Sequence, residues 1–188
     1  MDARADAVAS TRSRICDAAR ALFLDKAIED VTLASIAAAA GVSHQTVLNH
    51  FDSKEGVIVA VAEMFREETV DNRDATPGDV AGAVRALVGD YEQMGDANVR
   101  WIASSERMST LAGLLDDARR GHQEWIVRMF GASLPTSQAA RRHAIHALHA
   151  ATDVYVWKLL RRDLHLSRGE TERTMVDLVV GILKGITP

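Results

Sequence analysis

The stretch that decides the fold is Thr32–Phe51, with the sequence TLASIAAAAGVSHQTVLNHF. Its first half has apolar residues at helical spacing and predicts a short helix. Thr32 can accept hydrogen bonds from the free amide groups of the first turn, and Gly41 can adopt the left-handed conformation that ends the helix. Ser43 is placed to cap a second short helix. Two short helices joined by a glycine turn are typical of a helix-turn-helix.

The second short helix offers polar side chains on the side opposite its apolar residues. Val47 and Phe51 would anchor it from behind, while the other positions can donate to or accept from base edges and phosphates. A helix that enters the major groove of DNA needs both a rigid support and a polar outer face. The polar residues available for such contacts are His44, Gln45, Thr46 and Asn49.

Further helices are predicted on both sides of this stretch. From Thr11 to about Lys26, apolar residues recur at intervals of three and four and predict a first helix. Residues 1–10 lack such spacing, so we expect a flexible arm there. Asp52 and Glu55 have the spacing of a capping box that would open a longer helix.

The remainder of the chain is also predicted to be helical. Ala, Leu, Arg and Glu dominate between three widely separated prolines, and alternating β-branched residues are hardly seen. We therefore predict an all-α fold of about nine helices, in which a three-helix DNA-binding domain at 11–56 precedes a helical domain at 57–188. The further helices expected in the second domain cover about 81–94, 98–108, 110–130, 138–162 and 168–184.

Composition narrows the class of protein. Hydrophobic residues make up 47% of the chain and charged residues 26%, the balance of a globular protein, and no apolar run is long enough to cross a bilayer. Cys16 is the only cysteine, which excludes an intramolecular disulfide and fits a reducing compartment. The first residues lack the apolar core of a signal peptide, so we expect a cytoplasmic protein with no membrane partner.

The charge of the N-terminal segment argues against broad electrostatic attraction to DNA. Residues 1–60 contain six Lys or Arg and eight Asp or Glu, and the whole chain has a formal net charge of −4. Non-specific affinity for DNA comes from cations that neutralise phosphates. We therefore predict modest non-specific binding and reliance on specific contacts made by two subunits together.

The run VTLASIAAAAGVSHQTVLNHFDSKEGVI, residues 31–58, resembles the signature of the tetracycline-repressor-like (TetR) regulators. The Ala-Gly-Val-Ser turn, the His-Phe pair and the Ser-Lys-Glu step fall in register with that family, and the resemblance spans about residues 11–61. It implies a ligand-responsive transcription regulator, usually a repressor, that binds a palindromic operator as a homodimer and needs no cofactor. It also implies that the C-terminal domain binds a small-molecule effector and dimerises.

Carried over by position, the resemblance implies a set of DNA-contacting residues. Lys54 matches a basic residue that holds a phosphate at the head of the fourth helix, and Arg12 and Arg14 are expected to contact the DNA backbone near the first helix. The full predicted set is Arg12, Arg14, Thr32, Ser43, His44, Gln45, Thr46, Leu48, Asn49, His50 and Lys54.

Three positions depart from the family pattern. Leu48 stands where the family usually has Tyr, so a hydroxyl contact to phosphate is missing, although a leucine can contact a thymine methyl instead. Ala27 replaces a frequent Gly, and Asp52 stands where Pro is common.

Aromatic and methionine side chains after the helix-turn-helix are candidates for a ligand pocket. Such side chains can line a cavity for a largely apolar effector, with a histidine to orient it. Ordinary core packing is the alternative for each of them. The candidate pocket set is Phe65, Met94, Trp101, Met108, Trp125, Met129 and His149.

Two helices near the C-terminus have the pattern of a dimer interface. The stretch 144–160 is apolar on nearly its whole circumference, and a helix of this kind needs cover on both sides. In the resembling family the last two helices pair with their copies in a four-helix bundle, whereas simple monomer core is the alternative. The predicted interface set is Ile145, Leu148, Thr152, Tyr155, Leu178, Gly181, Ile182 and Gly185.

Other functions remain as alternatives. His143, His146 and His149 suggest metal sensing, but the outer two point in different directions on a helix, and we predict no metal site. No phosphate loop, nucleophile elbow or zinc-binding His-Glu helix is found, so we do not expect an enzyme. A dimeric helical adaptor that binds protein would fit the weak basic character.

Overall fold

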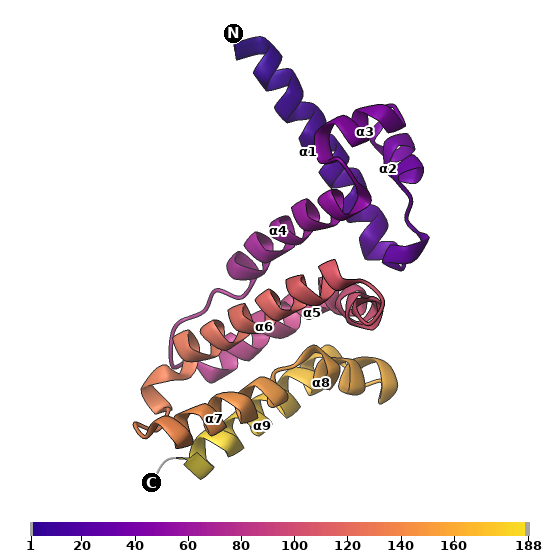
Figure 1. The fold of residues 1–188 in the computed structure, drawn as a ribbon. Coiled ribbons are helices and arrows are strands. Elements are labelled where there is room, and N and C mark those ends of the chain that lie inside the picture. Colours follow the sequence, from indigo (N-terminus) through magenta and orange to yellow (C-terminus); the bar gives the residue numbers. More distant parts are fainter. Residues whose placement is uncertain (1, 187–188) are drawn as a thin grey trace. The chain divides into compact units, whose positions relative to one another are not determined.

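The computed structural model describes residues 2–186, and all regular secondary structure in that range is helical (Figure 1). The elements are nine α-helices, two short 3-10 turns and one π-helical segment. This confirms the predicted all-α fold of about nine helices. By their contacts, the residues form two compact units, Met1–Glu67 with Arg100–Leu115, and Glu68–Val99 with Asp116–Pro188.

The first unit contains the helix-turn-helix. Helix α2 (Leu33–Ala40) ends at Gly41, whose φ of 65° is left-handed, and helix α3 (His44–Phe51) follows. Helix α1 (Asp2–Asp25) lies against α2, and the 3-10 turn η1 (Ile28–Asp30) connects the two. The buried core of this unit includes Ile15, Ala19, Phe23, Ile36, Val47, Phe51, Val57 and Val61.

Helix α1 begins at Asp2, well before the predicted start at Thr11. The segment predicted as an arm is therefore helical from Asp2. It contains alanine and arginine but neither glycine nor proline, and residues 5–10 are exposed. Good helix formers extend a helix into solvent without needing a buried face. Apolar spacing detects only helices that have such a face, and so it placed the start too late.

Helix α4 (Lys54–Asn72) is not opened by the predicted capping box. The Gly56 amide donates to Ser53 Oγ at 3.2 Å, so Ser53 caps the first turn. Asp52 instead ends α3 with a φ of 61°, the left-handed region. The carbonyl of Phe51 lies so close to Gly56 that a Cβ at that position would collide with it, which explains the glycine there.

The second unit consists of the later helices. Helix α5 (Val80–Ser105) and helix α6 (Ser109–Phe130) supply residues to both units, and the 3-10 turn η2 (Gly131–Ser133) follows α6. Helix α7 (Gln138–Ala151) lies beside α9 (Arg168–Ile186) (Figure 1). Between these two come the short helix α8 (Val154–Lys158) and the π-helical segment η3 (Leu159–Asp163).

Two predicted helix boundaries in this unit are wrong. The helices expected at 81–94 and 98–108 form the single helix α5, which continues through Gly95; a Cβ at Gly95 would collide with the indole ring of Trp157. The single helix expected at 138–162 is interrupted after α7. There the Tyr155 amide donates to Asp153 Oδ1 at 2.9 Å, so Asp153 starts a new helix.

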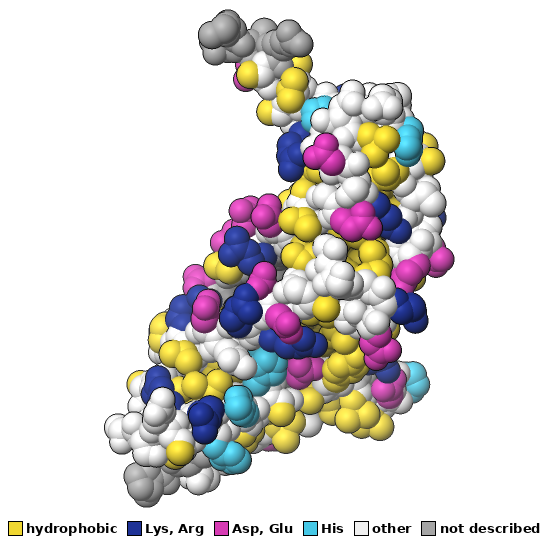
Figure 2. Space-filling model, in the orientation of Figure 1, with side chains coloured by type: hydrophobic (Ala, Val, Ile, Leu, Met, Phe, Trp, Pro, Cys, Tyr) yellow, Lys and Arg dark blue, Asp and Glu magenta, His cyan; other side chains and the backbone are white. Residues whose placement is uncertain are grey.

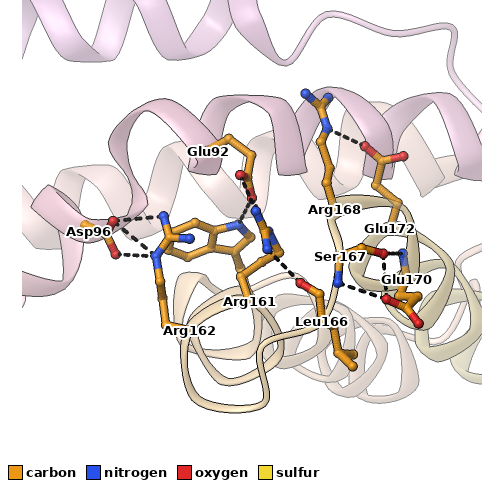
Figure 3. Close-up of polar contacts among 10 residues, drawn as sticks. Glu92, Asp96, Arg161, Arg162, Leu166, Ser167, Arg168, Glu170 and Glu172 are labelled. Carbon is orange, nitrogen blue, oxygen red and sulfur yellow. Dashed lines mark hydrogen bonds and ion pairs between the residues drawn. The ribbon is translucent and has the colours of Figure 1, made fainter.

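The segment around η3 is tied to α5 by ion pairs (Figure 3). Arg161 donates to both oxygens of Glu92, at 2.7 and 2.9 Å, and also to the carbonyl of Leu166 at 2.6 Å. Glu92 accepts a further bond from Trp157 Nε1 at 2.9 Å, and these donors lower the pKa of its carboxyl group. Arg162 pairs with Asp96 and lies over the Trp157 ring.

Candidate nucleic-acid interface

Helix α3 presents a polar and uncharged face to solvent. Gln45 and Asn49 are exposed one turn apart, on the side opposite the buried Val47 and Phe51. Gln45 Nε2 donates to Asn49 Oδ1 at 2.9 Å, so the two amides are held as a pair. This bond leaves the Asn49 amide nitrogen and the Gln45 oxygen for other partners. Amide side chains of this kind can match the donor and acceptor on the edge of an adenine.

The other α3 residues predicted to contact DNA are exposed to different degrees. His44 is exposed in the first turn, whereas Thr46, Leu48 and His50 are partly buried. Leu48 has no hydrogen-bonding group and can offer only its methyl groups to a base. The side chains of α3 therefore provide amides, imidazoles, a hydroxyl and an apolar tip, but no cation of the lysine or arginine type.

The predicted helix caps Thr32 and Ser43 are confirmed. The Ser35 amide donates to Thr32 Oγ1 at 3.1 Å, and the Thr32 amide donates to Ser35 Oγ at 3.0 Å, which completes a capping box for α2. The Thr46 amide donates to Ser43 Oγ at 3.0 Å, and the Thr46 hydroxyl lies 2.8 Å from the same oxygen. These bonds fix the start of both helices of the motif.

The three cations predicted to hold phosphates all donate to backbone carbonyls of the first unit. Arg12 Nη1 donates to the carbonyl of His50 at 2.8 Å, and Arg14 Nη2 donates to that of Ala40 at 2.8 Å. Lys54 Nζ lies 2.5 Å from the carbonyl of Ile28, and burial lowers the pKa of this amine. These carbonyl partners could not be inferred from spacing, and the phosphate contacts of the three cations stay a prediction.

Residues 32–51 contain no Lys, Arg, Asp or Glu. Figure 2 shows the consequence, because the surface over α2 and α3 in this view consists mostly of uncharged atoms. Positive and negative side chains alternate elsewhere in the same picture. The surface over α2 and α3 therefore has little charge with which to attract phosphates at long range.

The seven residues of the candidate pocket set are divided between the two units. Phe65, Trp101 and Met108 belong to the first unit, where the rings of Phe65 and Trp101 meet edge to face at a centroid distance of 5.5 Å. The Trp101 indole nitrogen is buried there with no hydrogen-bond partner. The members in the second unit are Met94, Trp125, Met129 and His149.

A buried polar network in the second unit was missed at the sequence level. Arg73 pairs with Asp90 at 2.7 Å and lies 3.1 Å from Nδ1 of His122. Tyr91 donates to the carbonyl of Thr152 at 2.9 Å, and burial raises the pKa of Tyr91 to about 12. Arg73 stands in the polar segment after α4, which has no periodic signal, so only the folded structure reveals that it is buried.

His149 lies at the edge of this network. Its ring meets that of His122 at a centroid distance of 4.7 Å, and His122 in turn stacks on Trp125 at 5.3 Å. His149 Nε2 is 3.7 Å from Asp153, while its Nδ1 is buried without a hydrogen-bond partner. Burial lowers the pKa of His149.

Within residues 2–186, no group of three or more His, Cys, Asp or Glu side chains is arranged to hold a metal ion. His143 and His146, the other two members of the histidine series, are exposed on α7. None of the helices in the described range combines the length and apolar character needed to cross a membrane.

The predicted dimer interface divides into buried and exposed residues. Leu148 and Thr152 are fully buried within the chain and therefore belong to its own core. Ile145 and Ile182 are partly buried, while Gly181 and Gly185 are exposed. Tyr155 and Leu178 are exposed, as are two leucines outside the predicted interface set, one of which, Leu159, lies in the stretch 144–160. These four exposed side chains, Tyr155, Leu159, Leu164 and Leu178, are between 43% and 56% exposed.

Comparison of the sequence with known proteins adds independent findings for the N-terminal part. Residues 15–61 match the family model described as bacterial regulatory proteins, tetR family. The chain is also 37% identical over 65 residues to the HTH-type transcriptional regulator AlkX of Mycobacterium tuberculosis. That match covers 35% of this chain and only 31% of AlkX, so it spans about a third of the length of each protein.

Solved structures share the fold over almost the whole chain. A tetR-family transcriptional regulator from Streptomyces coelicolor aligns over 94% of this chain and 82% of its own, with a TM-score of 0.76 and 17% identity. A complex of SmeT with triclosan aligns over 92% of this chain and 90% of its own, with a TM-score of 0.66 and 19% identity. At these identities the likeness shows the fold alone.

Proposed function

We propose that the chain is a transcriptional regulator of the TetR family, which binds a two-fold-symmetric operator as a homodimer and is released by a small molecule. In this proposal residues 11–56 read DNA, and residues 57–188 bind the effector and dimerise. The protein works in the cytoplasm, by occupying promoter DNA as a repressor rather than by catalysis.

The observation that carries the DNA-binding proposal is the outer face of α3. An eight-residue helix, capped by Ser43 and held from behind by Val47 and Phe51, presents the paired amides of Gln45 and Asn49 to solvent. Such a helix can enter the major groove, where amide groups discriminate between base pairs. His44, Thr46 and His50 make neighbouring contacts, and Leu48 contacts a thymine methyl. The amino-terminal ends of α2 and α3, at Thr32 and Ser43, face phosphates.

The DNA-binding proposal is tested with a selected operator. Random duplexes retained by the full-length protein are sequenced, and affinity for the selected site and for a scrambled site is measured by fluorescence anisotropy at fixed salt. Asn49→Ala should lower affinity for the selected site by about 5- to 100-fold and leave affinity for the scrambled site unchanged. The matched control is Gln93→Ala, which removes an exposed amide from α5 in the second unit and should change neither affinity. Failure to retain any sequence at low salt would instead favour the adaptor hypothesis.

The dimer proposal rests on the exposed side chains Tyr155, Leu159, Leu164 and Leu178. Large apolar residues on a soluble surface often mark a protein interface, and a second copy of this chain offers the same residues in a two-fold arrangement. Leu178→Glu should shift the protein from dimer to monomer in analytical ultracentrifugation, because it would bury a charge in that interface. Val70→Glu changes a residue of similar exposure outside this set and should leave the mass unchanged.

The effector proposal rests on a solved complex that shares this fold and on buried side chains of the second unit. SmeT, which shares this fold, is known in complex with triclosan, and the second unit of this chain contains buried Met94, Trp125 and Met129. Methionine and aromatic side chains adapt to apolar ligands. Native mass spectrometry of the purified protein would reveal a retained small molecule. A molecule of this kind should also weaken operator binding when it is added back.

A further inference from the structure

We propose that Arg12 and Arg14 are positioning residues, which orient α3 and α2 for DNA reading by capping their carboxyl ends, instead of contacting DNA phosphates. The inference rests on the proposed DNA binding, and it changes the role that the sequence resemblance implied for these two arginines. It concerns the first unit alone.

The two arginines reach different helices from the same part of α1. Arg12 donates to the carbonyl of His50, in the last turn of α3, and its guanidinium carbon lies 4.2 Å from the centroid of the Phe51 ring. Arg14 donates to the carbonyl of Ala40, the last residue of α2, at 2.8 Å, and reaches that of Gly41 at 3.5 Å. One short segment of α1 therefore holds the carboxyl ends of both helices of the motif.

These carbonyls need donors from outside their helices. The last four carbonyls of any α-helix lack an amide partner within the helix and carry a partial negative charge. In α3, the amide of Asp52 bonds to Leu48 O and that of Ser53 to Phe51 O. Arg12 supplies a donor for the carbonyl of His50, for which no backbone donor is found.

In α2, too, the terminal carbonyls accept from both backbone amides and an arginine. Backbone amides of the following turn donate to two of the last four carbonyls. The amides of Val42 and Gly41 bond to the carbonyls of Ala37 and Ala38, and Arg14 serves Ala40. Since α2 and α3 have only eight residues each, four terminal carbonyls are half of each helix. Short helices are marginal on their own, so external caps matter more here than in a long helix.

A positioning role also fits the lack of charged residues in the helix-turn-helix, residues 32–51. With no Lys or Arg in residues 32–51, the helices gain little from long-range attraction, and discrimination depends on how accurately Gln45 and Asn49 meet base edges. Arg12 acts close to Asn49, because it holds the next residue, His50, through the carbonyl and stacks on Phe51. Loss of this cap would let the end of α3 fray and move the amide of Asn49.

Salt dependence separates this role from phosphate binding. Each phosphate contact contributes about 0.9 to the slope of log K against log salt, so loss of one contact per subunit would lower the slope of a dimer by about 1.8. A capping arginine contributes nothing to that slope. Operator affinity of the full-length protein is measured between about 50 and 300 mM KCl by fluorescence anisotropy, for the wild type, Arg12→Gln and the control Arg66→Gln, an exposed arginine of α4.

We expect Arg12→Gln to weaken operator binding by about fivefold or more and to reduce the preference for operator over scrambled DNA, while the slope stays unchanged. In the free protein, hydrogen exchange of the α3 amides should become faster, and Arg66→Gln should change none of these quantities. A slope lowered by about 1.8 with unchanged α3 exchange would overturn the proposal.

Arg12→Lys keeps the test valid if Arg12→Gln folds poorly. Lysine keeps the charge and can still bind a phosphate, but it lacks the planar group that lies on Phe51 while donating to the His50 carbonyl. Faster α3 exchange and reduced sequence preference in Arg12→Lys support positioning, and wild-type behaviour in both refutes it. If the wild type binds no DNA, the proposed function fails, whereas exchange in the free protein still decides whether Arg12 caps α3.

Discussion

Acidification from pH 7.5 to 5.5 should destabilise the protein through one buried histidine, His122. Its Nδ1 lies 3.1 Å from Arg73 Nη1, and a guanidinium can only donate, so Nδ1 must accept. The proton is therefore on Nε2, which donates to the hydroxyl of Thr152 at 2.8 Å, and that hydroxyl donates to the carbonyl of Leu148 at 2.7 Å. The bond from Arg73 requires a neutral ring, because a protonated imidazole has no acceptor nitrogen.

The pKa of His122 is lowered well below 6.5, first by burial and then by the charges of Arg73 and His149. In the unfolded chain the same ring takes up a proton near pH 6.5. The folded state then binds fewer protons than the unfolded state, so stability is present above pH 6.5 and is lost as the pH falls below it. A single histidine of this kind reduces the free energy of unfolding by about 1.4 kcal/mol between pH 7.5 and 5.5. Burial lowers the pKa of His149 as well, and its contribution has the same sign.

The measurement is urea unfolding at pH 7.5, 6.5 and 5.5, at one protein concentration because the proposed dimerisation would be linked to folding. His122→Gln removes the titrating group and should reduce the loss between pH 7.5 and 5.5 by about 1.4 kcal/mol. His143→Gln, an exposed histidine on α7, should leave the pH dependence as in the wild type. Equal pH dependence in the wild type and His122→Gln would refute the reasoning, as would an NMR titration of His122 with a midpoint at or above pH 6.5.

Two further predictions concern stability. Gly95→Ala should lower the free energy of unfolding by about 1–3 kcal/mol, because the new methyl group collides with the Trp157 ring, whereas Gly113→Ala in α6 has open space and should be neutral or stabilising by about 0.5–1 kcal/mol. A urea titration that shows equal effects would contradict the packing described here. Ser43→Ala removes the acceptor for the Thr46 amide and should cost about 1 kcal/mol, visible as a lower Tm in calorimetry, while Ser43→Thr should retain most of the stability.

The helix-turn-helix was predictable because its signals are local. Thr32, Gly41 and Ser43 act on amides or on a backbone angle within a few residues, and all three have the predicted roles. The apolar spacing of α3 likewise identified Val47 and Phe51 as its buried side. Local rules failed around Gly95, where two helices were predicted and the structure has one; the missing side chain at Gly95 leaves room for the distant ring of Trp157.

Sequence alone therefore determined the all-α class, the two helices of the helix-turn-helix and the exposed amides of α3, since helix propensity, caps and apolar spacing operate over one or two turns. The hydrogen-bond partners of Arg12, Arg14 and Lys54 are 38, 26 and 26 positions away in the chain. From the sequence alone, one cannot infer whether such a long, positively charged side chain will donate to a DNA phosphate or to a backbone carbonyl. The burial of Arg73 and His122 was decided in the same way, by tertiary packing, because the free energy of a polar group depends on which other groups surround it after folding.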